Sequence, residues 1–176
     1  MATKSPAKKT TSARTSKAAS DANDPFEMLK SDHREVEKMH KAYEKLVESE
    51  ADAEERGELA ARICAALTVH ATVEEEVFYP PVREAIDDDD IMDHADVEHE
   101  SAKDLIAQIE SMGPDDSHYD AKVTVLCEYV AHHVKEEEEE MFPKARKAKG
   151  IDFAALAQEM AARKAELEAE YAEMAS

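Results

Sequence analysis

The chain has 176 residues, with 42 Asp and Glu against 22 Lys and Arg, which gives a formal net charge of −20. This length corresponds to one domain and a tail, and the charge argues against a body that binds nucleic acid phosphates or anionic membranes. With three Gly, no Trp and 5% aromatic residues, the composition predicts an all-α protein. No apolar run approaches the ~18 residues of a membrane span, so we expect a cytoplasmic protein.

The N-terminal segment differs in composition from the rest of the chain. Residues 1–20 contain no acidic residue and carry five positive charges among Ser, Thr and Ala. Such a segment cannot bury enough apolar surface to offset its conformational entropy, so we expect a disordered basic tail over residues 1–23. The tail would act as a solubilising arm or, as the weaker alternative, as a tether for nucleic acid.

The first two predicted helices follow the tail. Asp24 followed by Pro25 is typical of a helix N-terminus, so we expect the first helix over residues 25–49. A second apolar series with helical spacing follows a short polar link. We expect that helix to end near Pro80 and Pro81, because proline lacks the backbone N–H that a helix interior needs.

Three further helices are predicted from the same spacing. The third follows the acidic run at residues 87–90 and ends near Gly113. The fourth ends near Pro143 or, if the chain only kinks there, near Gly150. A fifth apolar stripe occupies the C-terminal segment.

The short links between the first four helices predict their packing. A short link returns the chain beside the helix that it left, so residues 24–149 should form an up-and-down antiparallel four-helix bundle. The C-terminal helix over residues 150–176 has an apolar stripe with a spacing of about 3.5 residues, which has to be buried. This helix would pack on the bundle or join two chains as a homodimer.

Two segments of the sequence repeat each other. HATVEEEVFYP begins at His70, and HVKEEEEEMFP begins at His133. Each histidine is followed four residues later by a glutamate, Glu74 or Glu137. Residues four apart lie one turn apart on nearly the same helix face, so each pair can point inward at a metal ion.

Two more histidines share the inward register. His33 lies four residues after Leu29, and His99 lies four residues after Ala95. Residue counts from the turns place them at the level of the repeated histidines on antiparallel helices. An unpaired buried Glu is costly, and a metal centre accounts for the whole set. The predicted metal ligands are His33, His70, Glu74, His99, His133 and Glu137.

The donor types limit the choice of metal. Imidazole and carboxylate ligands without thiolate fit iron, manganese or zinc better than copper(I) or an iron–sulfur cluster. Two carboxylates that can bridge favour two metal ions a few Å apart. Whether Glu75 or Glu138 also ligates stays open. Tyr129, one turn before His133, would either pack in the core or donate a hydrogen bond to a bound ligand.

These residues, with the paired HxxxEE segments that end in Pro, resemble the hemerythrin-like HHE cation-binding domain over about residues 24–145. The resemblance implies a four-helix bundle with a non-haem di-iron centre. It also implies oxygen binding or sensing, iron handling, or peroxide and nitric oxide chemistry. Oxygen carriers of this type have a second His where this chain has Ala95, and Asp where it has Glu137. Both differences weigh against reversible oxygen carriage.

We therefore expect two iron ions, with manganese or zinc less favoured, and a small oxidant ligand: dioxygen, peroxide or nitric oxide. The role would be binding, sensing or iron handling. Two alternatives stay open. One is a di-iron enzyme that consumes peroxide or nitric oxide or oxidises ferrous iron, and the other is a bundle that zinc only stabilises.

Overall fold

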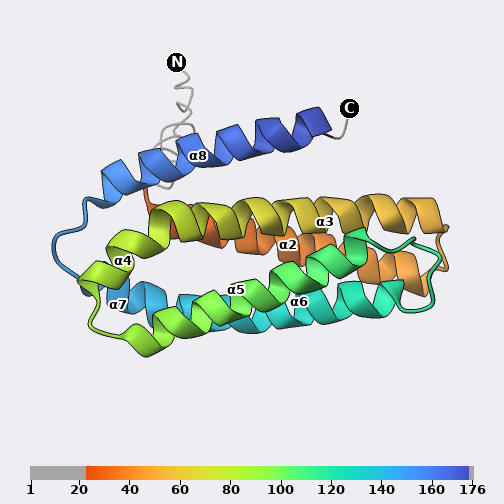
Figure 1. Ribbon diagram of the computed structural model, residues 1–176, viewed down its shortest axis with the longest axis horizontal. Coiled ribbons are helices and arrows are strands. Elements are labelled where there is room, and N and C mark those ends of the chain that lie inside the picture. Colours follow the sequence, from red (N-terminus) through yellow and green to blue (C-terminus); the bar gives the residue numbers. More distant parts are fainter. Residues whose placement is uncertain (1–22, 175–176) are drawn as a thin grey trace, which may run out of the picture.

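The computed structural model describes residues 23–174, so nearly all of the predicted tail over residues 1–23 lies outside the described part. Within that part every regular element is helical, and four rods run antiparallel as predicted (Figure 1). The rods are α2 (Pro25–Glu48), α3 (Ala53–Val73) with η1 (Glu74–Phe78) and α4 (Tyr79–Ala85), α5 (Asp89–Glu110), and α6 (Tyr119–Glu136) with η2 (Glu137–Met141) and α7 (Phe142–Lys147).

Aspartate side chains cap the N-termini of three of the rods. Asp24 accepts hydrogen bonds from two backbone N–H groups of α2, and Asp52 and Asp88 each accept one at the starts of α3 and α5. A carboxylate at this place satisfies N–H groups that have no partner within the helix and faces the positive end of the helix dipole. The first helix ends at Glu48, one residue before the predicted end.

The prediction that the second helix ends near Pro80 and Pro81 is wrong. The rod continues through both prolines to Ala85, and the fourth rod likewise passes Pro143 and ends at Lys147. In each rod a π-helical turn, η1 or η2, comes before the proline, so the ring sits in the first turn of a new α-helical segment. There its missing N–H breaks no hydrogen bond that the helix requires.

The bundle core consists of two apolar clusters at different heights. One contains Phe26, Phe78 and Phe142, whose ring centroids lie 5.4–5.7 Å apart in pairs. The other is built around Tyr43 and Ile63. On α2 the first cluster uses residues before His33 and the second uses residues after it. The layer at the height of His33 is therefore enclosed by apolar side chains on both sides.

The C-terminal helix, α8 (Phe153–Met174), lies along α2 and α3 (Figure 1). Its Leu156, Met160 and Leu167 are buried in the first apolar cluster. The apolar stripe is thus covered within the chain, and the homodimer through this helix stays a prediction. Every helix within residues 23–174 is too short or too polar to cross a bilayer.

Candidate metal centre

The six residues expected from the sequence meet in the middle of the bundle. In the part of the chain that the structure describes, they are the only buried residues with an imidazole or carboxylate side chain. Their exposed fractions run from 0% for Glu74 to 8% for His70. Four helical rods supply them: His33 from α2, His70 and Glu74 from α3 and η1, His99 from α5, and His133 and Glu137 from α6 and η2.

The nitrogen donors form two pairs. Nε2 of His33 lies 3.2 Å from Nε2 of His70, and the corresponding atoms of His99 and His133 lie 3.1 Å apart. Among the six inner residues, donor atoms that lie within 4.8 Å of one another define two groups, which share one glutamate. One group is His33, His70, Glu74 and Glu137, and the other is Glu74, His99 and His133.

The two glutamates connect the histidine pairs. Oε2 of Glu74 lies 3.3 Å from Nε2 of both His70 and His99. Oε2 of Glu137 lies 3.4 Å from Nε2 of His33 and 3.5 Å from that of His133. Each carboxylate therefore faces one histidine of each pair, in an arrangement with approximate two-fold symmetry.

Outer carboxylates orient the imidazoles. Nδ1 of His33 donates to Glu138 at 2.7 Å, Nδ1 of His99 to Glu75 at 2.9 Å, and Nδ1 of His133 to Glu98 at 2.7 Å. An ionised carboxylate only accepts, so the proton of each ring lies on Nδ1. The Nε2 lone pair then points into the layer, as in histidines that bind metals.

The fourth histidine has a weaker outer contact. Nδ1 of His70 lies 3.5 Å from Oδ2 of Asp32, without a hydrogen bond. Asp32 comes directly before His33, and Glu98 comes directly before His99. Both residues reach across to the histidine of the neighbouring rod. The outer contacts therefore follow the same two-fold pattern as the inner residues.

The inner layer contains more acceptors than donors. Both oxygens of Glu74 and Oε2 of Glu137 are buried without a hydrogen-bond partner. Unsatisfied buried carboxylate oxygens cost several kcal/mol, and the Nε2 atoms that face them carry no proton while the imidazoles are neutral. The residues present therefore fit cations bound between them.

The charges of the layer shift the pKa values of its members. Burial, followed by repulsion from Glu137, raises the pKa of Glu74 to about 7. Burial also opposes ionisation of Glu137, yet attraction to His133 and His33 outweighs it and holds that pKa at about 2. Burial opposes protonation of His33, but the carboxylates around it raise its pKa to about 9. Without a metal, a proton on His33 supplies part of the missing positive charge.

One hydroxyl breaks the two-fold symmetry. Tyr79 donates to Oε1 of Glu137 at 2.9 Å, and its oxygen lies 3.3 Å from Nε2 of His99. The second copy of the repeat has Phe142 at this place, and that ring stacks on His33 with a centroid distance of 6.1 Å. Burial, then the charges of Glu137 and Glu74, raises the pKa of Tyr79 well above its usual range. The phenol therefore keeps its proton.

Three of these contact residues were not predicted from the sequence, namely Asp32, Glu98 and Tyr79. Their signal in the sequence was their place next to the inner histidines and in the aromatic part of the repeat. Glu75 and Glu138, which the sequence left open as ligands, contact Nδ1 atoms on the outer side of the rings. Tyr129, for which the sequence left open core packing or a hydrogen bond to a bound ligand, lines a cavity beside His133.

Two spaces reach the layer. A cavity of about 30 Å³ touches His70, His99 and His133 and is otherwise lined mainly by apolar side chains such as Ile106 and Val130. A groove of about 450 Å³ between α2 and α6 reaches His33. The inner cavity has room for one small molecule, since a water needs about 10–15 Å³ by the same measure.

A four-helix bundle with clusters of buried His and Glu side chains is the architecture of a hemerythrin-type, cation-binding protein. The model of the Hemerythrin HHE cation binding domain matches residues 24–145 of this chain. The chain belongs to this family, and the buried His and Glu clusters make a cation-binding site.

Two similar proteins extend the comparison. The crystal structure of a hemerythrin HHE cation binding domain-containing protein from Mycobacterium kansasii matches with a TM-score of 0.68 and 22% identity, covering 84% of this chain and 88% of that chain. This likeness shows the fold. A DNA nickase of Nostoc sp. is 36% identical over 80 residues, which make up 46% of this chain and 22% of the nickase. The match therefore spans about a fifth of the nickase.

Proposed function

We propose that this protein binds two iron ions in the bundle core and uses them to bind a small oxidant: dioxygen, peroxide or nitric oxide. The observation that supports this most strongly is the shared glutamate. Glu74 is fully buried, has no hydrogen-bond partner at either oxygen, and belongs to both groups of donor atoms. A carboxylate in this position suits a bridge between two cations.

The donor set favours a metal of intermediate softness. His33 and His70 would hold one ion through Nε2, and His99 and His133 would hold the other. Glu74 and Glu137 would neutralise charge between the two ions. Four imidazoles and two carboxylates without a thiolate suit iron, with manganese and zinc as the alternatives.

The surrounding residues limit what can reach the ions. When bound, iron would supply redox chemistry between its ferrous and ferric states. The cavity beside His99 and His133 has room for a molecule of two or three atoms, and the larger groove between α2 and α6 reaches His33. Tyr79, which belongs to the first apolar cluster and does not line the cavity, donates its hydroxyl proton to Glu137.

The activity named for the Nostoc relative is not part of this proposal. That match covers a small part of the nickase, and this chain carries a net charge of −20, which opposes binding to DNA phosphates. The cavity of about 30 Å³ beside His99 and His133 is also too small for a nucleotide.

Anaerobic loading of the full chain with ferrous iron tests the proposal. Metal content is counted, and the visible spectrum is recorded before and after addition of air and then peroxide. We expect two irons per chain and a new visible band on oxidation. A double variant, H70A with H133A, should lose stoichiometric iron, whereas the exposed His94→Ala variant should keep it. Two irons in the double variant, or no spectral response in the wild type, would overturn the proposal.

A further inference from the structure

A third group of donor atoms lies outside the bundle core. Glu98 on α5 and His132 and Glu136 on α6 each place one ligand atom within 4.8 Å of the other two. Nε2 of His132 lies 3.2 Å from Oε1 of Glu136. The His132 side chain is 64% exposed and that of Glu98 is 15% exposed, so this group opens to solvent.

The internal repeat shows what is unusual about this group. Val69 and Val73 hold the same places in the first copy as His132 and Glu136 in the second. Both valines are buried in the cluster to which α8 contributes. The helix α8 packs over the valines of the first copy. In the second copy, a histidine and a glutamate one turn apart take the places of these valines.

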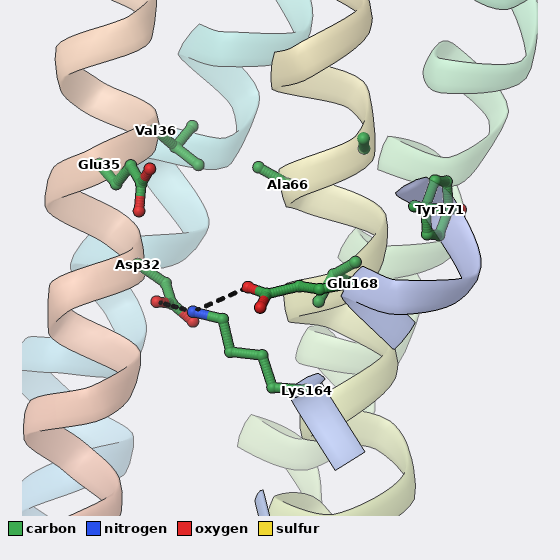
Figure 2. A pocket seen from close by; sticks show the side chains of 9 residues that line it. Asp32, Glu35, Val36, Ala66, Lys164, Glu168 and Tyr171 are labelled. Atoms are coloured by element: carbon green, nitrogen blue, oxygen red, sulfur yellow. Dashed lines mark hydrogen bonds and ion pairs between the residues drawn. The ribbon is translucent and has the colours of Figure 1, made fainter. Parts of the chain in front are cut away.

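The covered side of the bundle has a cation at the corresponding carboxylate. Nζ of Lys164, on α8, lies 2.6 Å from Oδ1 of Asp32 and 3.8 Å from Glu168 (Figure 2). Asp32 in turn contacts Nδ1 of His70. The positive charge of the lysine thus compensates a carboxylate that touches an inner histidine.

The open side lacks that compensation. Glu98 contacts Nδ1 of His133 through Oε2, as Asp32 contacts His70. Among the residues that the structure describes, no lysine or arginine forms an ion pair with Glu98 or Glu136. Where the first half has an ammonium group, the second half has an imidazole and a further carboxylate.

We propose that Glu98, His132 and Glu136 form a peripheral site for a divalent first-row transition metal ion. One imidazole and two carboxylates are ligands that zinc, manganese and ferrous iron accept, and exposure leaves room for water at the remaining positions. The cation takes the place that Lys164 has on the other side. Glu98 links this site to the inner one, because its Oε2 lies 2.7 Å from Nδ1 of His133.

Equilibrium dialysis of the full chain against Zn²⁺, with bound zinc counted, tests this site. The wild type and three single variants are compared: H132A, E136Q, and H94A as a control that removes an exposed histidine elsewhere on α5. We expect H132A and E136Q to bind one zinc fewer than the wild type and H94A. Circular dichroism checks that all variants are folded.

Two results would overturn the peripheral site. The first is that H132A binds as much zinc as the wild type. The second is that H94A loses as much bound zinc as H132A does. Failure of the inner centre is distinguishable, because it lowers the number of bound zinc ions equally in all four proteins and leaves the difference between them unchanged.

Discussion

The hydroxyl of Tyr79 donates a hydrogen bond to Oε1 of Glu137 at 2.9 Å, whereas the equivalent carboxylate, Glu74, has no donor at either oxygen. The two halves of the bundle supply the same histidines and glutamates, so this one hydroxyl makes the two donor groups unequal. Two metal ions bound there would have different surroundings.

Replacing Tyr79 by Phe should destabilise the metal-free protein. The change leaves Oε1 of Glu137 buried without a donor, which costs about 1–3 kcal/mol in the free energy of unfolding. Urea denaturation measures the loss. Tyr129→Phe is the matched control, because no hydrogen bond joins Tyr129 to the six inner residues, and it should change stability little. Equal losses in both variants would contradict the role assigned to Tyr79.

Replacing Glu74 by Gln should have opposite effects with and without metal. In the metal-free protein the variant removes a buried, unpartnered charge, so thermal stability should rise. In the loaded protein it removes the ligand shared by both groups, so bound iron should fall below two per chain. Calorimetry and metal analysis give the two readouts. Glu139→Gln, an exposed residue of the acidic run in the second copy of the repeat, should change neither.

The metal-free and loaded proteins should respond differently to pH. The folded pKa of His33, about 9, exceeds the unfolded value of 6.5, so its protonation stabilises the fold fully below pH 6.5. This stabilisation, about 3 kcal/mol, is lost as the pH rises toward 9. The folded pKa of Glu74, about 7, is also raised, so its contribution is lost between about pH 4.5 and 7.

Melting temperatures between pH 5 and 9 check this prediction. The metal-free protein should become less stable throughout the interval. The loaded protein should hold or gain stability, because cations compete with protons for the same Nε2 and carboxylate atoms. Parallel pH profiles for the two forms would show that the six residues do not bind the metal.

Replacing Lys164 by Met should weaken the attachment of α8. The partly buried ion pair with Asp32 is lost, at a cost of about 1 kcal/mol. Urea denaturation gives the change in stability, and hydrogen exchange shows whether amides of α8 lose protection first. Lys38→Met, at an exposed position on α2, is the control. Unchanged exchange in α8 would contradict this view of the helix.

The inner residues could be predicted from the sequence because their geometry is local. A His and a Glu four residues apart share a helix face wherever the helix packs, and the repeat around His70 and His133 makes chance spacing an implausible explanation. His33 and His99 followed from the apolar stripes around them. All of these residues are buried where the stripes place them.

The residues that were missed depend on contacts between helices or on irregular turns. Asp32 and Glu98 each contact a histidine of a neighbouring rod, which no spacing within one helix reveals. Tyr79 comes five residues after Glu74, and in an α-helix this spacing places the two side chains on different faces. The π-helical turn brings the two residues nearer to one face, and the same turn lets the rod pass Pro80.

The most direct test of the account is a crystal structure of the iron-loaded protein with anomalous diffraction recorded at the iron absorption edge. We predict two iron peaks in the bundle core, one between His33 and His70 and one between His99 and His133, with Glu74 next to both. A single peak, no peak, or peaks away from these residues would contradict the account.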